Sequence, residues 1–454
     1  MLMKLSVENF KSFNELSELT MIPSNKIRKN NEHKSLIRNV GILKSAVIYG
    51  ANASGKSNLI EVLHYMKHCV TNEIPVESIS MFCKNQEENI KKTSTFEVQI
   101  MKNQRFYAYG FELLLSSKKI VSEWIYELFP TGEAKRLFEH TVGIEGIIDE
   151  GVKLSKEDKL KFKTYADDLK DNDSVLFIYE MNRNKRFDND SKLVFFKDIY
   201  EWFNSDLNIL KPNMPITNFE YYYDLNSLNY INKIIRTFDT GISEVNINEI
   251  SLDELSNRLP KEIFMDIMTK IKNSMLNSHK EVKLSMRSNF EFFNISIKEG
   301  EEPVVTTITL KHKNSFYDFR FDEESDGTRR LFDLLDILLS KNENAIYVVD
   351  ELERSLHPKL TFHFIELFQK LNIHKNVQLI FTTHEPSIMD YSLFRRDEIW
   401  FVERNNSNSS KLYSLDMFKE RYDKKLSKAY LEGRYGAIPI FQSFTYDKED
   451  NFLY

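Results

Sequence analysis

A glycine-containing loop between an apolar strand and an apolar helix constrains this chain most. Residues 50–57 read GANASGKS and fit G-x-x-x-x-G-K-[ST], the pattern of a phosphate-binding loop. Residues 45–49 before it predict a short strand, and residues 58–63 after it predict the start of a helix. In such a loop successive backbone N–H groups point at one anion, and the helix N-terminus adds partial positive charge. A turn with a surface lysine would also fit the pattern, but the two flanks favour a site for nucleotide phosphates.

The loop residues have separate predicted roles. Lys56 can reach the β- and γ-phosphates of a nucleoside triphosphate, and the Ser57 hydroxyl can ligate Mg²⁺. The expected ligands are therefore ATP and Mg²⁺. The nucleotide-binding residues that the motif predicts are Gly50, Asn52, Ser54, Gly55, Lys56, Ser57 and Asn58.

Composition narrows the class of protein. The 454 residues are 41% hydrophobic and 29% charged, an ordinary globular balance with enough chain for two or three domains. A net charge of −6 argues against coating nucleic acid along the whole length, but leaves room for a local basic patch. Cys69 and Cys83 make neither a disulfide framework nor a zinc pattern, so a reducing cytoplasm is the simplest compartment. We find no signal-peptide core and no apolar run that could span a bilayer.

Changes in pattern divide the chain into four predicted segments. Residues 1–144 combine the phosphate loop with strongly alternating stretches over 94–130, which predict antiparallel strands. Residues 145–289 are rich in Lys, Asp and Asn and have helical periodicity without sustained heptads, which predicts a helical insertion and no long coiled coil. Strand pattern returns in 290–404, and residues 405–454 form a C-terminal tail.

Three local patterns have alternative interpretations. Residues 24–39 are polar and basic, which favours a solvated loop over a nucleic-acid contact. His64 and His68 share one helix face, but the glutamate of H-E-x-x-H is missing and no further ligands follow, so a metal site is not expected. The tyrosines at 221–223 fit core packing or an interface better than a base-stacking platform.

Charged and polar residues end two further buried strands. Residues 346–349 are apolar and lead into Asp350 and Glu351, and two ionised carboxylates there are costly unless a cation matches them. Asp350 is expected to support Mg²⁺ through water, whereas Glu351 points elsewhere and can polarise attacking water as a general base. His384 ends another buried strand, 34 residues after Asp350, and can donate to the γ-phosphate.

A second anion-binding device lies about 270 residues after the first. Ser325 and Gly327 open a predicted helix, where a serine hydroxyl and the helix N-terminus both favour an anion. One chain therefore carries two phosphate-facing devices.

Together these segments resemble the ABC-type ATPases of the SMC and OLD-nuclease clade. In that clade a phosphate loop, an S-x-G signature helix, a strand ending in Asp-Glu, a D-loop and a switch histidine follow in this order. More narrowly, the chain resembles the stand-alone AAA/ABC-hybrid ATPases of bacterial anti-phage modules, with the ATPase subunits of the PARIS, Septu and AbiL systems as relatives. The helical middle carries almost none of the resemblance, which lies in Leu5–Phe13, Ile48–Leu59, Glu323–Leu335, Val348–Pro358, Leu379–Asp390, Arg395–Phe401 and Tyr430–Pro439.

The resemblance implies an α/β fold, namely an ABC-type P-loop NTPase head with an antiparallel β subdomain and a helical insertion. It implies a Mg²⁺-dependent ATPase in which ATP is sandwiched between two heads. Because the chain has one phosphate loop and one signature, a homodimer is required to build two composite sites. The implied roles are phosphate and Mg²⁺ binding for Lys56 and Ser57, γ-phosphate contact across the interface for Ser325 and Gly327, Mg²⁺ support for Asp350, water activation for Glu351 and γ-phosphate sensing for His384.

The sequence departs from the family pattern in the signature, the D-loop and the Q-loop. The signature reads Ser-Asp-Gly-Thr-Arg, the D-loop contains Ser355-Leu356-His357, and no glutamine has a convincing Q-loop context. Hydrolysis is therefore expected to be slow or to serve as a switch.

The expected partners are a second copy of the chain and a separate effector. The tail after His384 has about 70 residues, too few for the nuclease domain that OLD-type proteins carry there, so a nuclease would act in trans. The sequence predicts no membrane contact and gives no support for direct DNA binding. A DNA-repair or chromosome-associated SMC-like ATPase is the alternative, and it would need a long coiled coil or a basic groove.

Overall fold

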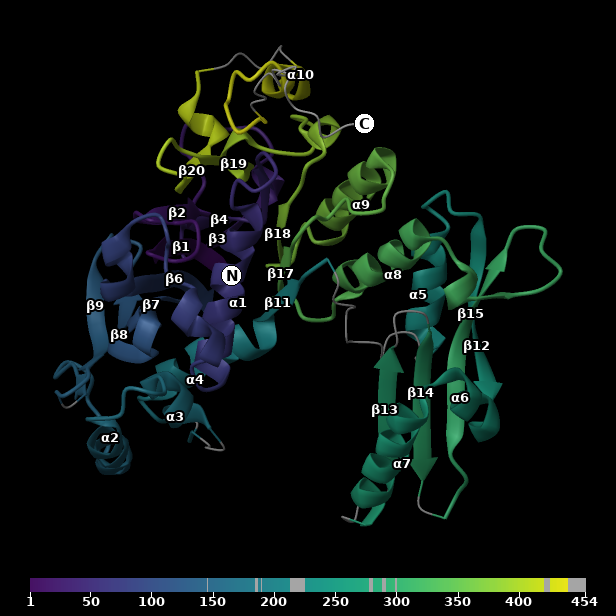
Figure 1. Cartoon of the computed structure of the whole chain (residues 1–454), viewed down its shortest axis with the longest axis horizontal. Coiled ribbons are helices and arrows are strands. Elements are labelled where there is room, and N and C mark those ends of the chain that lie inside the picture. Colours follow the sequence, from purple (N-terminus) through teal and green to yellow (C-terminus); the bar gives the residue numbers. More distant parts are fainter. Residues whose placement is uncertain are drawn as a thin grey trace, which may run out of the picture. The chain divides into compact units, whose positions relative to one another are not determined.

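The computed structural model describes residues 1–144, 146–183, 187–188, 190–212, 225–276, 281–287, 291–298, 300–419 and 425–439. The tyrosines at 221–223 lie outside the described residues. The chain folds into two compact units (Figure 1). The first unit consists of Met1–Ile209, Asn344–Asp350 and Lys375–Tyr454, and the second of Leu210–Glu343 and Glu351–His374. The predicted boundaries at 145, 290 and 405 were drawn from changes in sequence pattern, whereas the two compact units are defined by contacts between residues. These boundaries therefore stay a prediction.

A seven-stranded antiparallel sheet forms one half of the first unit. Its strand order is β10-β9-β8-β7-β6-β1-β2. The strands predicted over 94–130 are confirmed, because the apolar side chains that alternate along them are buried against the core. The strands are β1 (Leu2–Glu8), β2 (Ser17–Thr20), β6 (Ser94–Lys102), β7 (Arg105–Leu114), β8 (Lys119–Leu128), β9 (Ala134–Thr141) and β10 (Ile147–Ile148).

A six-stranded sheet positions the phosphate loop. Its order is β11-β17-β18-β5-β19-β20, and the four strands β17, β18, β5 and β19 run parallel. Every residue of β5, β17 and β18 is buried, which fits their mainly apolar sequences because a parallel sheet is covered on both faces. The strands are β5 (Ser45–Tyr49), β11 (Leu207–Leu210), β17 (Ile346–Val349), β18 (Gln378–Thr382), β19 (Ile399–Arg404) and β20 (Ser410–Ser414).

Helices and one small hairpin complete the first unit. Helix α1 (Lys56–Thr71) follows β5 directly. Helices α2 (Lys156–Leu169), α3 (Phe177–Asn182) and α4 (Val194–Glu201) share an aromatic core with β9, formed by Phe138, Phe162, Phe177 and Phe196. The hairpin pairs β3 (Lys34–Ile37) with β4 (Val40–Leu43), and α10 (Leu426–Leu431) is the last helix of the described part of the tail. No described helix is both long and apolar enough to cross a membrane.

The second unit is an antiparallel sheet with helices on it. The strands β12 (Ile242–Ile250), β15 (Val304–His312), β14 (Phe292–Lys298) and β13 (Glu281–Arg287) are neighbours in this order, and β16 (Phe319–Arg320) pairs with β15. Helices α6 (Leu252–Arg258) and α7 (Lys261–Leu276) lie beside this sheet (Figure 1). Their buried apolar side chains form a core with side chains of β14 and β15. The unit also contains α5 (Leu225–Ile235), α8 (Asp326–Leu339) and α9 (Pro358–Leu371).

The predicted helical insertion contains strands as well as helices. The helical periodicity of 145–289 is realised in α2 to α7, but β12 and β13 also lie in this segment. Polar residues interrupt the apolar alternation of β12, and its pairing partner β15 begins 54 residues later, at Val304. The strand therefore depends on a long-range pairing that local periodicity does not reveal.

One buried carboxyl group joins the antiparallel sheet to α3. Glu123 in β8 is fully buried, and its carboxylate oxygens accept hydrogen bonds from the backbone N–H groups of Phe177 at 2.5 Å and Ile178 at 3.1 Å. The Tyr109 hydroxyl donates a third hydrogen bond at 3.0 Å. Burial raises the pKa of Glu123 to about 7, although the three donors oppose this shift.

This shift predicts that the first unit loses stability as the pH rises from about 4.5 to about 7. In this window the unfolded chain releases the Glu123 proton while the folded chain keeps it, so the free energy of unfolding falls by up to about 3 kcal/mol. Unfolding of wild type and Glu123→Gln at pH 5 and pH 7.5 measures the effect. Glu123→Gln should show the smaller pH dependence, with the exposed Glu133→Gln as the matched control. Equal pH dependence in all three proteins would contradict the assignment.

Candidate functional site

The carboxyl ends of three neighbouring parallel strands meet at one edge of the six-stranded sheet. Gly50 follows β5, Asp350 follows β17, and His384 lies two residues after β18. Because β18 lies between β17 and β5, the phosphate loop and Asp350 flank the strand that leads to His384. Ligands bind at this edge in open α/β sheets. The first unit therefore brings together three of the elements that the sequence predicts for a nucleotide site.

Lys56 is the charged centre of this edge. Its side chain is buried, and the ammonium group donates hydrogen bonds to the carbonyl oxygens of Gly50 at 2.7 Å and Ala51 at 3.1 Å. Nζ also lies 3.4 Å from Nδ1 of His384. The loop carbonyls hold a buried positive charge within the loop, and such a charge is stabilised further by an anion.

The loop backbone requires glycine at its second glycine position. Gly55 has φ +112°, in the left-handed region, and a Cβ atom there would collide with the hydroxyl groups of Ser410 and Ser12. Gly55 is also the N-cap of α1 and supplies no side-chain cap, so no side-chain oxygen of the cap residue competes with an anion for the first N–H groups of the helix.

The residues present fit a nucleotide with Mg²⁺. The Ser54 hydroxyl is buried and has no hydrogen-bond partner among the described atoms, which leaves it available to a ligand. Asp350 is buried and accepts a hydrogen bond from the Thr382 hydroxyl at 2.6 Å. In the described part of the chain no cluster of three or more His, Cys, Asp or Glu residues can hold a metal by itself. Mg²⁺ needs no such cluster when one carboxylate, a serine hydroxyl, water and phosphates ligate it, and Asp350 and Ser57 offer the protein's share.

The sequence did not predict a set of hydroxyl groups that form hydrogen bonds with the phosphate loop and with the start of α1. Ser410 donates from its hydroxyl to the carbonyl of Ser54 at 2.5 Å, and its backbone N–H donates to the carbonyl of Ser12 at 2.7 Å. Asn58 donates to the Ser12 hydroxyl at 2.8 Å. Ser12 lies in a turn and Ser410 begins β20, nearly 400 residues later, so no local pattern connects them. Thr382, which orients Asp350, is a further residue that the sequence did not single out.

The second unit carries the predicted signature. Ser325 is the N-cap of α8, hereafter the signature helix, and its hydroxyl accepts a hydrogen bond from the N–H of Thr328 at 3.1 Å. The S-x-G segment therefore opens a helix, as the sequence indicates. Glu351 and Ser355 have φ +51° and +61°, so two residues of the segment that follows β17 adopt the left-handed conformation. The contact of Ser325 and Gly327 with a nucleotide on a second copy stays a prediction.

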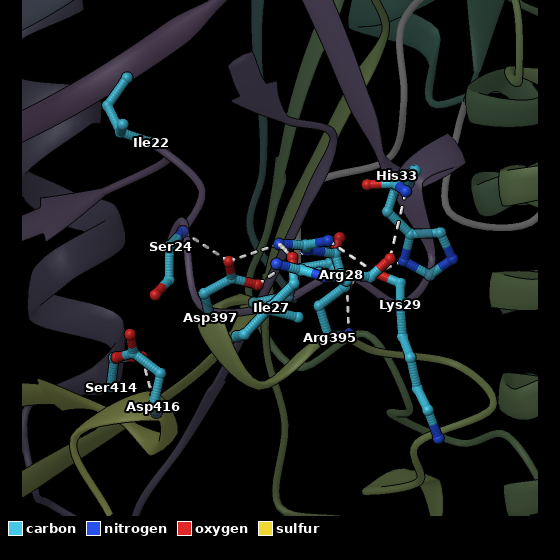
Figure 2. A network of polar contacts seen from close by, with 12 residues as sticks. Ile22, Ser24, Ile27, Arg28, Lys29, His33, Arg395, Asp397, Ser414 and Asp416 are labelled. Carbon is cyan, nitrogen blue, oxygen red and sulfur yellow. Dashed lines mark hydrogen bonds and ion pairs between the residues drawn. The ribbon is translucent and has the colours of Figure 1, made fainter.

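A buried polar network fixes the segment before β3, as Figure 2 shows. The Arg395 side chain forms two hydrogen bonds with the Asp397 carboxylate, at 2.9 and 2.8 Å. It also donates to the carbonyls of Lys29 at 2.7 Å and Ile27 at 3.4 Å, and Asp397 accepts from the N–H of Ser24 at 2.8 Å. The stretch Arg395–Phe401, which resembles the ATPase family, thus begins with residues that hold the polar segment in place.

The same network leaves the basic side chains of residues 24–39 on the outside. Lys26 and Arg28 are exposed, while His33 is buried and contacts the Glu398 carboxylate at 2.9 Å. Burial raises the pKa of Glu398, and the hydrogen bond from His33 opposes this shift. The segment is held in place through its backbone. Its basic side chains fit both a solvated loop and a nucleic-acid contact.

The chain matches, over residues 45–390, the family described as "AAA domain, putative AbiEii toxin, Type IV TA system". A search of the curated proteins finds no match.

Solved structures give looser similarities. The SMC head domain from Thermotoga maritima is 14% identical, with 91% of this chain and 98% of that chain covered and a TM-score of 0.37. An SMC head from Pyrococcus furiosus, with an extended coiled coil and bound to the C-terminal domain of ScpA, is 12% identical, with 96% and 98% covered and a TM-score of 0.31. TM-scores below 0.5 are too low to carry a function to this chain.

The family match covers well over half of the chain, including the phosphate loop, Asp350 and His384. This chain therefore belongs to that family of AAA-domain proteins.

Proposed function

We propose that the chain is a Mg²⁺-dependent ATPase that closes as a head-to-head homodimer around two ATP molecules and controls a separate effector in anti-phage defence. The observation that carries the ATPase part is the position of Lys56. Its buried ammonium group lies on the carbonyls of the phosphate loop and beside His384, and Asp350 ends a strand of the same sheet edge.

Each residue has a defined task in hydrolysis. Lys56 and the backbone of its loop bind the phosphates, and Ser57 and Asp350 hold Mg²⁺. When bound, Mg²⁺ neutralises charge on the phosphates. Glu351 accepts the proton of the attacking water, and His384 donates to the γ-phosphate.

The homodimer follows from the number of elements in one chain. Ser325 is the N-cap of α8, and Gly327 lies in the first turn of this helix. A second copy would place this anion-binding device on the nucleotide of the first, and symmetry would then build two equal sites.

Effector control rests on the family description. The description names a toxin of a type IV toxin–antitoxin system, which is a module of more than one gene product. The alternative, an SMC-like ATPase of DNA repair or chromosomes, would need a long coiled coil, whereas the longest helices of the described residues, α1 and α7, have 16 residues each. This observation favours the stand-alone ATPase.

Lys56→Ala should lower the affinity for ATP at least tenfold, about 1.4 kcal/mol, because the loop loses its only buried ammonium among the described residues. Calorimetric titration with Mg-ATP measures the affinity. Lys67→Ala is the matched control, since Lys67 lies on the same helix and donates to the carbonyl of Leu207. Unchanged affinity in Lys56→Ala would refute the phosphate-loop assignment.

Glu351→Gln should keep ATP binding, retain only a small residual rate of hydrolysis and accumulate a closed dimer, because the amide cannot accept the water proton. Phosphate release gives the rate, and mass measurement in solution with and without ATP gives the dimer. Glu366→Gln on α9, where Glu366 is half-buried and pairs with Lys370, serves as the control. Hydrolysis at the wild-type rate would show that Glu351 is not the base, and a mass that stays monomeric with ATP would contradict the dimer.

Expression from the native gene cluster should yield a complex of the chain with a neighbouring gene product that has effector activity, such as a nuclease. Affinity purification of the tagged chain followed by mass spectrometry identifies it, and ATP should change the amount that is bound. Co-purification with recombination or repair proteins in place of an effector would favour the SMC-like alternative.

A further inference from the structure

A buried arginine on the signature helix lies against the backbone of the predicted general base. Arg330 is only 6% exposed. Its guanidinium donates from Nη2 to the carbonyl oxygen of Glu351 at 3.3 Å. Both residues belong to the second unit, so this contact lies within one compact body. The contact is to the main chain of Glu351.

The backbone of Glu351 needs such support. Its φ of +51° is a left-handed conformation that is unfavourable for a residue with a side chain. The same carbonyl oxygen accepts a second hydrogen bond, from the N–H of Arg354 at 3.1 Å. Two donors on one carbonyl hold the turn in a conformation that the sequence alone would disfavour.

A second contact joins the same two segments. A Cβ atom on Gly327 would lie 2.7 Å from the carbonyl oxygen of Ser355, so the first turn of the signature helix packs directly on the D-loop backbone. Ser355 also has a left-handed φ, +61°. The turn 351–355 is therefore attached to the signature helix at both ends, by Arg330 at its start and by Gly327 at its end.

We propose that Arg330 is a positioning residue, which fixes the turn that carries Glu351 to the signature helix and so aims the Glu351 carboxylate. This inference rests on the proposed ATPase function and adds a residue to it.

The charges around Arg330 support a dedicated role. Burial lowers the pKa of its guanidinium, which shows that the charge is held at a cost in hydration. The groups that face it are the acids Asp333, Glu353 and Glu351, which favour its charge, and Arg354, which opposes it. A buried ionic group of this kind adds little to stability compared with an apolar side chain of the same size. Stability alone therefore gives little reason for an arginine at this position.

The contact has a consequence for a dimer with two sites. In the proposed head-to-head arrangement, Glu351 of one chain acts on the nucleotide bound by that chain, and Ser325 of the same chain acts on the nucleotide of the other. Arg330 lies on the helix that Ser325 caps, and it contacts the backbone of Glu351. A nucleotide that displaces this helix would therefore also displace the general base that acts on the other nucleotide.

Arg330→Met tests this role, because methionine keeps much of the length and loses every donor. We expect kcat for ATP hydrolysis to fall at least tenfold, since a misplacement of about 1 Å can cost up to 100-fold, while KM changes less than threefold. Arg330→Lys retains one donor and should recover part of the rate. In the Glu351→Gln background, Arg330→Met should lower the residual rate at most twofold, because it acts through Glu351.

Arg258→Met is the matched control for the loss of a partly buried arginine. Arg258 pairs with Glu254 and Glu291 elsewhere in the second unit, and its replacement should leave kcat within twofold of wild type. Thermal unfolding checks that each variant is folded. If Arg330→Met does not fold, Arg330→Lys decides, with a kcat at least threefold below wild type as the supporting result.

A folded Arg330→Met with the kcat of wild type, or an equal loss in both backgrounds, would overturn the positioning role alone. A wild-type protein that binds no ATP or hydrolyses none would instead overturn the proposed function, and the role of Arg330 with it.

Discussion

The buried ammonium group of Lys56 is the interaction on which the rest of the site depends. A charge taken out of water must find partners, and the carbonyls of Gly50 and Ala51 provide them only because the loop folds tightly between β5 and α1. Parallel pairing with β18, and of β18 with β17, then sets Asp350 and His384 at the same edge. The sheet thus places the ammonium group of Lys56, the carboxylate of Asp350 and the imidazole of His384 at one edge.

The two carboxylates that follow β17 belong to different compact units. Asp350 is the last residue of its stretch in the first unit, and Glu351 begins a stretch of the second. Asp350 is held by the Thr382 hydroxyl of the neighbouring strand, whereas the backbone of Glu351 is held by Arg330 of the signature helix. Adjacent residues with the same chemistry therefore receive their orientation from independent supports, which suits their separate proposed roles in metal binding and proton transfer.

Sequence patterns succeeded where the physical cause is local. The alternation in 94–130 and the apolar runs of β5, β17 and β18 each report burial of a single element, and all of them are strands in the structure. The segment 145–289 was only partly predictable, because β12 becomes a strand through pairing with β15. Propensity within such a stretch is a weak guide when a distant strand decides its conformation.

By itself the sequence determined the phosphate loop, the S-x-G helix start and the strand ends near Asp350 and His384. Each of these features is a pattern of residue types within about ten consecutive residues. Only the tertiary structure decided what supports them. The hydroxyl groups under the loop come from Ser12 and Ser410, and the arginine that holds the Glu351 backbone comes from the signature helix. These contacts join residues between 21 and 356 positions apart, and a hydrogen bond across such a span leaves no periodicity or motif in either segment.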